Sequence, residues 1–229
     1  MPVTAASTTA ATTLTARALL LDMDGTLVDS GPAVERVWRA WALEHGLDGD
    51  QVLQVVHGRQ GFASMAILLP DRPMEQNIEE NARMLVLETV DTEGVTAIGG
   101  AADFLAALSL GGLPHALVTS ADDALARARM GAAGLALPPV AVTAEHVTRS
   151  KPDPEGFLLG ASLLGVAPAD CLVFEDSEAG VAAGLAAGMR VIGVGAATTG
   201  YGATVSVDTL DQVTVTATAS GTLTLTVTP

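Results

Sequence analysis

The chain has 229 residues, which is enough for one or two domains and for a core that needs no cross-links. Apolar residues make up 49% of it and charged residues 16%, which excludes a globally disordered chain. The net charge of −15 argues against a surface for nucleic acid or an anionic membrane, and the single cysteine excludes an internal disulfide. No apolar run approaches the ~18–20 residues of a membrane helix, so we expect a soluble, cytoplasmic protein.

The chain begins with a stretch of low complexity. Residues 1–16 are mostly Thr, Ala, Ser and Val, and they lack the charged and apolar segments of a secretory signal. We predict a disordered leader over these residues. The apolar run at residues 18–21 then predicts a buried strand, and the sequence DMDGT at residues 22–26 predicts a turn at its end.

The next segment, residues 31–94, has a helical pattern throughout. Trp38 and Trp41 share one face of its first helix, and we interpret them as core packing rather than as a surface that stacks on a substrate. The segment therefore predicts an all-helical domain inserted after the first strand. The predicted helices, separated by Gly, Pro and Asp, cover residues 33–45, 52–56, 62–69 and 74–90.

Beyond residue 94, strands and helices alternate. This alternation implies right-handed crossovers and a parallel sheet covered by helices on both faces. We therefore predict an α/β core made of residues 17–30 and 95–229. The predicted strands are residues 115–118, 140–143, 171–174 and 191–194, and the predicted helices are residues 101–110, 122–133, 154–164 and 178–187.

The C-terminal tail changes pattern again. Residues 214–218 and 222–228 alternate Thr with Val, Leu or Ala around a Ser-Gly pair at residues 220–221. Strict alternation about such a pair predicts a C-terminal β-hairpin. We expect this hairpin to extend the edge of the parallel sheet.

Polar side chains follow each of the first four core strands at its carboxyl end, where sheets of this kind bind ligands. They are Asp22 and Asp24 after the first strand, Thr119 and Ser120 after the second, Lys151 beyond the third, and Glu175 and Asp176 after the fourth. Clustered carboxylates repel one another unless a cation shares the site, and hard oxygen ligands favour Mg²⁺. Lys151, the single lysine among 11 basic residues, would add a second cation. A site with two cations is suited to bind a phosphoryl group.

The two aspartates suit different roles. Asp22 lies at the strand end and can act as the nucleophile, giving an aspartyl-phosphate. Asp24 lies two residues further on, so it points to the same side and can act as general acid and base. Thr119 and Ser120 add donors at the start of the next helix, where an anion is favoured.

These residues resemble the motifs of the haloacid dehalogenase (HAD) superfamily of phosphohydrolases, and the similarity spans about residues 18–194. The four motifs occur in the family's order as DMDGTLVDS at 22–30, VTS at 118–120, KPDP at 151–154 and FEDS at 174–177. The resemblance implies a Rossmann-like core, and it identifies the helical insertion as similar to a type-1 cap domain.

The resemblance also implies a role for each site residue. Asp22 would be the nucleophile and Asp24 the acid and base, while Thr119 and Lys151 would bind the phosphate. The magnesium ligands would be the Asp22 carboxylate, the Asp24 carbonyl and Asp176, with Glu175 nearby or ligating through water.

A turn between two predicted cap helices carries the sequence HGR at residues 57–59, which resembles that of small sugar- and polyol-phosphate phosphatases. We expect His57 and Arg59 to bind the substrate, with Arg59 directed at a second anionic or hydroxyl group. The alternative for Arg59 is a solvated surface residue.

Three functions are compatible with these patterns. The first is a Mg²⁺-dependent phosphatase that hydrolyses a hexose, hexitol or glycerol phosphate. The second is a phosphosugar mutase similar to β-phosphoglucomutase, and the third is a non-catalytic binder with a vestigial site. We expect a small phosphate ester as the partner, no nucleic acid or membrane, and a monomer or weak dimer.

Overall fold

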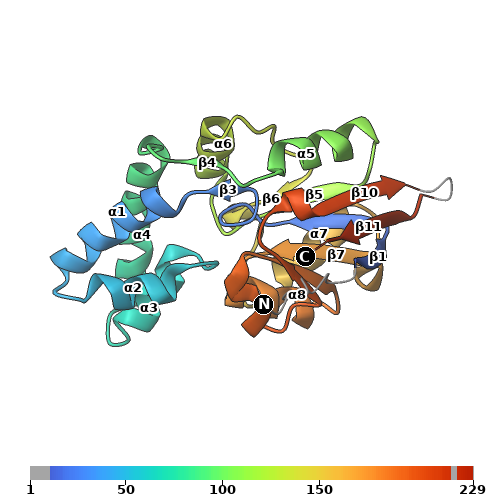
Figure 1. The fold of residues 1–229 in the computed structure, drawn as a ribbon. Helices are drawn as coiled ribbons and strands as arrows, with labels where there is room; N and C mark the ends of the chain where they lie inside the picture. Colours follow the sequence, from blue (N-terminus) through green and yellow to red (C-terminus); the bar gives the residue numbers. More distant parts are fainter. Residues whose placement is uncertain (1–10, 218–220, 229) are drawn as a thin grey trace, which may run out of the picture.

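The computed structural model describes residues 11–217 and 221–228. Its centre is a six-stranded, fully parallel sheet with the order β6-β5-β2-β7-β8-β9. The predicted α/β fold with a Rossmann-like parallel sheet is thereby confirmed (Figure 1). The strands of this sheet are β2 (Ala18–Leu21), β5 (His115–Val118), β6 (Ala141–Val142), β7 (Cys171–Glu175), β8 (Arg190–Val194) and β9 (Val205–Val207), of which β9 was not predicted.

Helices cover both faces of this sheet, as the alternation predicts. Strand β2 shows why, because all four of its residues are buried and successive side chains enter different cores. Leu19 and Leu21 pack with α5 (Ala101–Leu110) and α6 (Asp123–Ala132). Leu20, on the opposite face, packs with the helices α7 (Glu155–Leu163) and α8 (Glu178–Ala186).

Four further helices form the cap, which has an apolar core of its own. They are α1 (Gly31–Glu44), α2 (Gly49–Val56), α3 (Gly61–Leu68) and α4 (Met74–Val90). Trp38 and Trp41 meet edge to face in that core, with ring centroids 5.4 Å apart. A short antiparallel ribbon of β3 (Val28–Asp29) and β4 (Thr96–Ala97) carries the chain into the cap and back.

The N-terminal prediction was wrong for part of the segment. Thr12–Ala16 forms strand β1 instead of a disordered leader, while residues 1–10 lie outside the described part of the chain. Strand β1 pairs antiparallel with β11 (Leu223–Val227), more than two hundred positions away in the sequence. Ala16 is buried and Leu14 packs against the same core, so the apolar side chains of the segment secure it.

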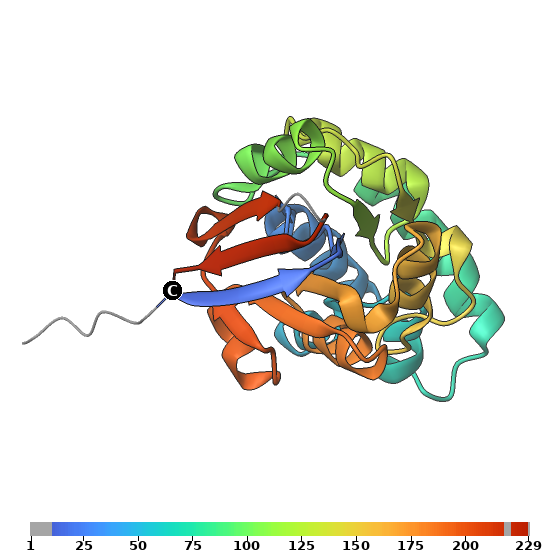
Figure 2. The same ribbon diagram turned by 90° about the vertical axis from the view of Figure 1, so that its right-hand side faces the viewer.

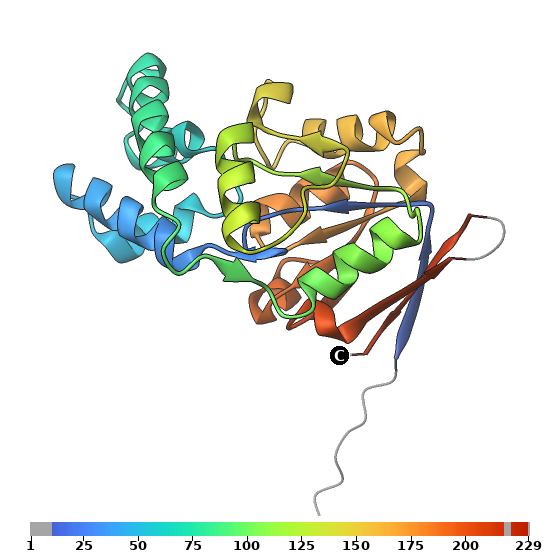
Figure 3. The same cartoon turned by 90° about the horizontal axis from the view of Figure 1, so that it is seen from above.

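The C-terminal hairpin forms as predicted from β10 (Val213–Ala217) and β11, but its expected position was wrong. It joins β1 in a separate three-stranded sheet with the order β1-β11-β10 and does not extend the parallel sheet (Figure 2). The reason is apolar burial, since Leu223, Leu225 and Val227 all face the core that α5 and α6 share. Figure 3 shows this small sheet and the cap at opposite ends of the molecule.

Within the described ranges, none of the helices combines the length and the apolar character that a membrane crossing requires.

Candidate active site

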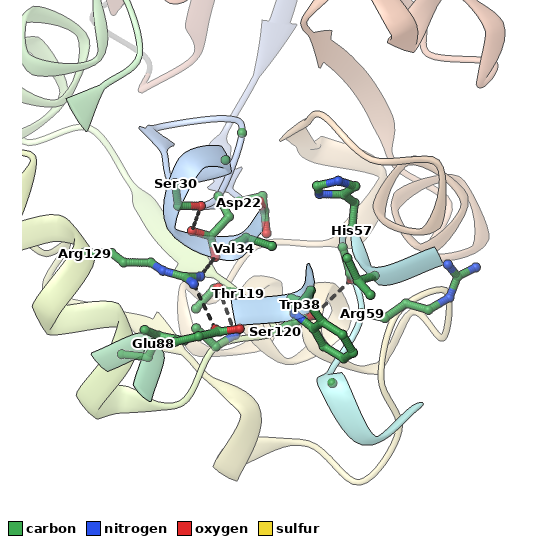
Figure 4. A pocket seen from close by; sticks show the side chains of 18 of the residues that line it. Asp22, Ser30, Val34, Trp38, His57, Arg59, Glu88, Thr119, Ser120 and Arg129 are labelled. Atoms are coloured by element: carbon green, nitrogen blue, oxygen red, sulfur yellow. Dashed lines mark hydrogen bonds and ion pairs between the residues drawn. The ribbon is translucent and has the colours of Figure 1, made fainter. Parts of the chain in front are cut away.

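A cavity of about 180 Å³ lies between the cap and the carboxyl ends of the core strands. Side chains from both parts of the molecule line it (Figure 4). Seven of the nine residues that the sequence singled out are among its lining residues: Asp22, Asp24, His57, Arg59, Thr119, Ser120 and Asp176. The remaining two, Lys151 and Glu175, are buried and contact Asp22 or its neighbours.

Lys151 is held by three acceptors. Its Nζ donates to Asp22 Oδ1 at 2.5 Å, to Glu175 Oε1 at 2.5 Å and to the Val118 carbonyl at 3.2 Å. Burial disfavours the charged ammonium, but the Asp22 and Glu175 carboxylates outweigh it and raise the pKa of Lys151. The ammonium is therefore fixed beside Asp22 as a permanent positive charge.

Glu175 occupies a fully buried position and uses both of its oxygens. While Oε1 accepts from Lys151, Oε2 accepts at 3.0 Å each from the Asp176 N–H, the Ser177 N–H and the Ser177 hydroxyl. Gly180 makes room for this arrangement, because a Cβ there would lie 1.8 Å from Glu175 Oε1. Glu175 is thus placed to hold Lys151 and the turn after β7.

Three carboxylates lie close together, and two of them, Asp22 and Asp176, line the cavity. Asp22, Glu175 and Asp176 can each present an oxygen within 4.8 Å of the others. Burial, with added repulsion from Glu175, raises the pKa of both Asp22 and Asp176 well above the usual range. A hard cation would relieve this repulsion, so the donor set fits a divalent ion such as Mg²⁺.

The turn after β2 brings Asp24 to the same place. Gly25 adopts a φ of +78°, and a Cβ on it would lie 2.0 Å from Asp176 Oδ2, so the close approach of the two turns requires glycine. Thr119, at the end of β5, is buried, and its Oγ1 accepts from the Ala121 N–H at 3.1 Å.

The cap reaches the core through the loop that carries His57 and Arg59. Ser120 Oγ donates to the Gly58 carbonyl at 3.0 Å, and the Gln60 N–H donates to Ser150 Oγ at 2.9 Å. Partial burial lowers the pKa of His57, which favours the neutral imidazole. Arg59 Nη1 donates to the Val55 carbonyl at 3.2 Å, so its guanidinium contacts the end of the preceding helix α2.

Sequence reasoning missed three residues around Asp24. Ser30 Oγ donates to Asp24 Oδ1 at 2.6 Å, and Arg129 Nη1 donates to Asp24 Oδ2 at 2.8 Å. Arg129 Nη2 also donates to Glu88 Oε2 at 2.9 Å. The helical period did contain a signal, because Arg129 falls on the apolar face of its predicted helix with Leu125.

Comparisons with known proteins agree with this geometry. A model of the haloacid dehalogenase-like hydrolases matches residues 16–188. The chain belongs to the haloacid dehalogenase-like hydrolase family. It is 48% identical over 180 residues to hexitol phosphatase A of Escherichia coli, covering 79% of this chain and 83% of that one.

Two further relatives extend the comparison. Glycerol-1-phosphate phosphohydrolase 2 of Saccharomyces cerevisiae is 32% identical over 198 residues, covering 82% of this chain and 78% of the yeast protein. The β-phosphoglucomutase structure from Clostridium difficile superposes with a TM-score of 0.76 at 22% identity, covering 86% of this chain and 92% of that one, which shows the shared fold. The family and these relatives make this protein a phosphoric monoester hydrolase.

Proposed function

We propose that this protein is a Mg²⁺-dependent phosphatase of small phosphorylated sugars or polyols, such as a hexose, hexitol or glycerol phosphate. The observation that carries the proposal is the placement of Asp22 between the Lys151 ammonium and the cavity, with Asp24 in the same cavity. Hexitol phosphatase A and the yeast glycerol-1-phosphate phosphohydrolase support the substrate class.

In this proposal Asp22 is the nucleophile. Its carboxylate forms a bond to phosphorus while the bond to the ester oxygen breaks, which leaves an aspartyl-phosphate. Lys151 and the Thr119 and Ser120 donors hold the phosphoryl oxygens. The Asp22 carboxylate, the Asp24 carbonyl and Asp176 would hold Mg²⁺, which when bound neutralises part of the charge on the phosphoryl group.

Asp24 moves the protons in both steps. In the first it donates a proton to the departing alkoxide, and in the second it takes one from the water that attacks the aspartyl-phosphate. The products are an alcohol and inorganic phosphate, and Asp22 and Asp24 return to their starting states. Glu175 acts through Lys151 in this scheme, because both of its oxygens already have partners.

The cap supplies contacts to the leaving group. We propose His57 and Arg59 for this role, since both line the cavity from the loop that contacts Ser120 and Ser150. The cytoplasmic location and the monomeric or weakly dimeric state belong to the same proposal. A phosphosugar mutase is the alternative, and it would return the phosphoryl group to the sugar instead of to water.

Phosphate release from a panel of phosphosugars and phosphopolyols tests the proposal, with Mg²⁺ or with EDTA. We expect release that requires the metal, that Asp22→Asn abolishes, and that Asp103→Asn, an exposed change on α5, leaves intact. Conversion of a phosphosugar to its isomer without phosphate release would favour the mutase. Binding of a phosphate ester without either reaction would favour the non-catalytic binder.

A further inference from the structure

A chain of three charged side chains, two of them buried, runs from the core into the cap along one side of the cavity. Arg129 on α6 contacts Asp24 on one side and Glu88 of cap helix α4 on the other, at 2.8 and 2.9 Å. The side chain of Arg129 is 4% exposed and that of Glu88 is 10% exposed. All three residues line the cavity, so this side of it consists of one cation between two carboxylates.

The position of these charges relates them to the leaving group. Asp24 is the group that we propose to protonate the ester oxygen, so the part of the substrate beyond that oxygen lies on the Asp24 side. The Arg129 guanidinium bridges Asp24 and Glu88, and Glu88 lies on the side of the cap that faces the core (Figure 4). A leaving group of several carbons that starts at Asp24 therefore extends toward Glu88.

The charges at this position favour one chemistry over another. The single positive charge of Arg129 lies between Asp24, which carries a proton when it acts as the general acid, and the Glu88 carboxylate, and Asp29 adds a further negative charge to the cavity lining. An anionic group placed here would meet a net negative wall that water screens poorly. Hydroxyl groups would not be repelled, because they are neutral and can donate hydrogen bonds to Glu88. A carboxylate has about four acceptor positions, and Arg129 occupies only part of those on Glu88.

We propose that Glu88 is a specificity-determining residue that selects neutral, hydroxyl-rich leaving groups over leaving groups that carry a second anion. This inference rests on the proposed phosphatase function. Glu88 accepts hydroxyl donors from the substrate and keeps Arg129 compensated. Without its charge, Arg129 retains only Asp24 as a partner and becomes able to attract a second anionic group.

Arg59 is the competing candidate for binding a second anionic group of the substrate. It lines the same cavity, and Figure 4 places it on the side away from Glu88 and Arg129. Its guanidinium donates to the Val55 carbonyl. If Arg59 sets the preference, bisphosphates and other phosphate esters whose leaving group carries a second anionic group would be good substrates of the wild type.

A pair of substrates that differ only at the far end isolates the effect. Sorbitol 6-phosphate and 6-phosphogluconate share the phosphorylated six-carbon chain, but one ends in a hydroxymethyl group and the other in a carboxylate. We expect the wild-type kcat/KM to favour sorbitol 6-phosphate by at least about 10-fold. In Glu88→Gln this ratio falls at least about 10-fold, mainly through KM, and in Glu88→Asp it is partly restored.

Glu79→Gln is the matched control, because Glu79 is an exposed carboxylate on the same helix α4, and we expect it to leave the ratio unchanged. An equal loss toward both substrates in Glu88→Gln would mean a merely structural role and would overturn the proposal. A wild type that prefers 6-phosphogluconate, with a preference that Arg59→Gln removes, would overturn it in favour of Arg59. Failure of the wild type to hydrolyse either ester or p-nitrophenyl phosphate would instead contradict the phosphatase function itself.

Discussion

Replacing Gly58 by alanine should prevent the cap loop from docking on the core. Gly58 has a φ of +76°, and a Cβ there would lie 2.0 Å from Ser177 Oγ and 2.6 Å from Ser177 Cβ. Ordinary contact begins at 3.4 Å, so the loop or Ser177 would have to retreat by about 1.4 Å. Ser177 cannot simply rotate, because its hydroxyl contacts Glu175 and accepts from the Gly180 N–H at 3.0 Å.

The loop is therefore the part that moves, and His57 and Arg59 move with it. A misplacement of about 1 Å can cost about 100-fold in rate. We expect kcat/KM toward a sugar or polyol phosphate to fall by about 10- to 100-fold in Gly58→Ala, measured by phosphate release under steady-state conditions.

Gly46→Ala is the matched control for this change. Gly46 is also in the cap and has a φ of +66°, but a Cβ on it would meet nothing within 4 Å. Both variants carry the left-handed backbone cost of about 1–2 kcal/mol, and only Gly58→Ala carries the clash. Gly46→Ala should therefore lose less thermal stability than Gly58→Ala and keep the wild-type kcat/KM. Wild-type kcat/KM in Gly58→Ala would show that the docked loop is not needed for the reaction.

Two further predictions concern stability and the buried thiol. Gly180→Ala should destabilise the fold by about 3 kcal/mol in urea unfolding, because the new Cβ displaces the buried carboxylate that pairs with Lys151. Gly131→Ala, in a helix with nothing within 4 Å, should instead stabilise the fold by up to about 1 kcal/mol, and equal effects would contradict the account. Burial raises the pKa of Cys171 to about 11, so the thiol should resist alkylation at pH 8 until the protein unfolds. Rapid alkylation of the native protein would show that the thiol is accessible. The stability that the buried neutral thiol contributes is present below the ordinary thiol pKa and is lost as the pH rises through 11.

The sequence predicted the parallel sheet and most of the site because both depend on local patterns. The site residues of the core lie at or beyond the carboxyl ends of β2, β5, β6 and β7, and strands of a parallel sheet place these ends at one edge. His57 and Arg59 instead follow the cap helix α2. The sequence could therefore predict that Asp22 and Lys151 lie close together although they are 129 positions apart. What a local pattern could not show is that both oxygens of Glu175 are engaged.

The errors share a different cause. Strand β1 has few apolar residues, and its partner β11 lies at the other end of the chain, so nothing near it in the sequence indicated order. The contact of Arg129 with Glu88 depends on how the cap sits on the core. Arg129 could have been noticed as a charge on an apolar helix face, but its two partners could not.

The position of the covalent intermediate decides whether Asp22 is the nucleophile. An acyl phosphate can be reduced with borohydride after a rapid acid quench, which converts a phosphorylated aspartate to homoserine, and peptide mass spectrometry then gives its position. We expect homoserine at Asp22 when the protein turns over a sugar or polyol phosphate with Mg²⁺, and none in Asp22→Asn. Homoserine at Asp24 instead, or turnover with no reduced residue at any quench time, would contradict this expectation.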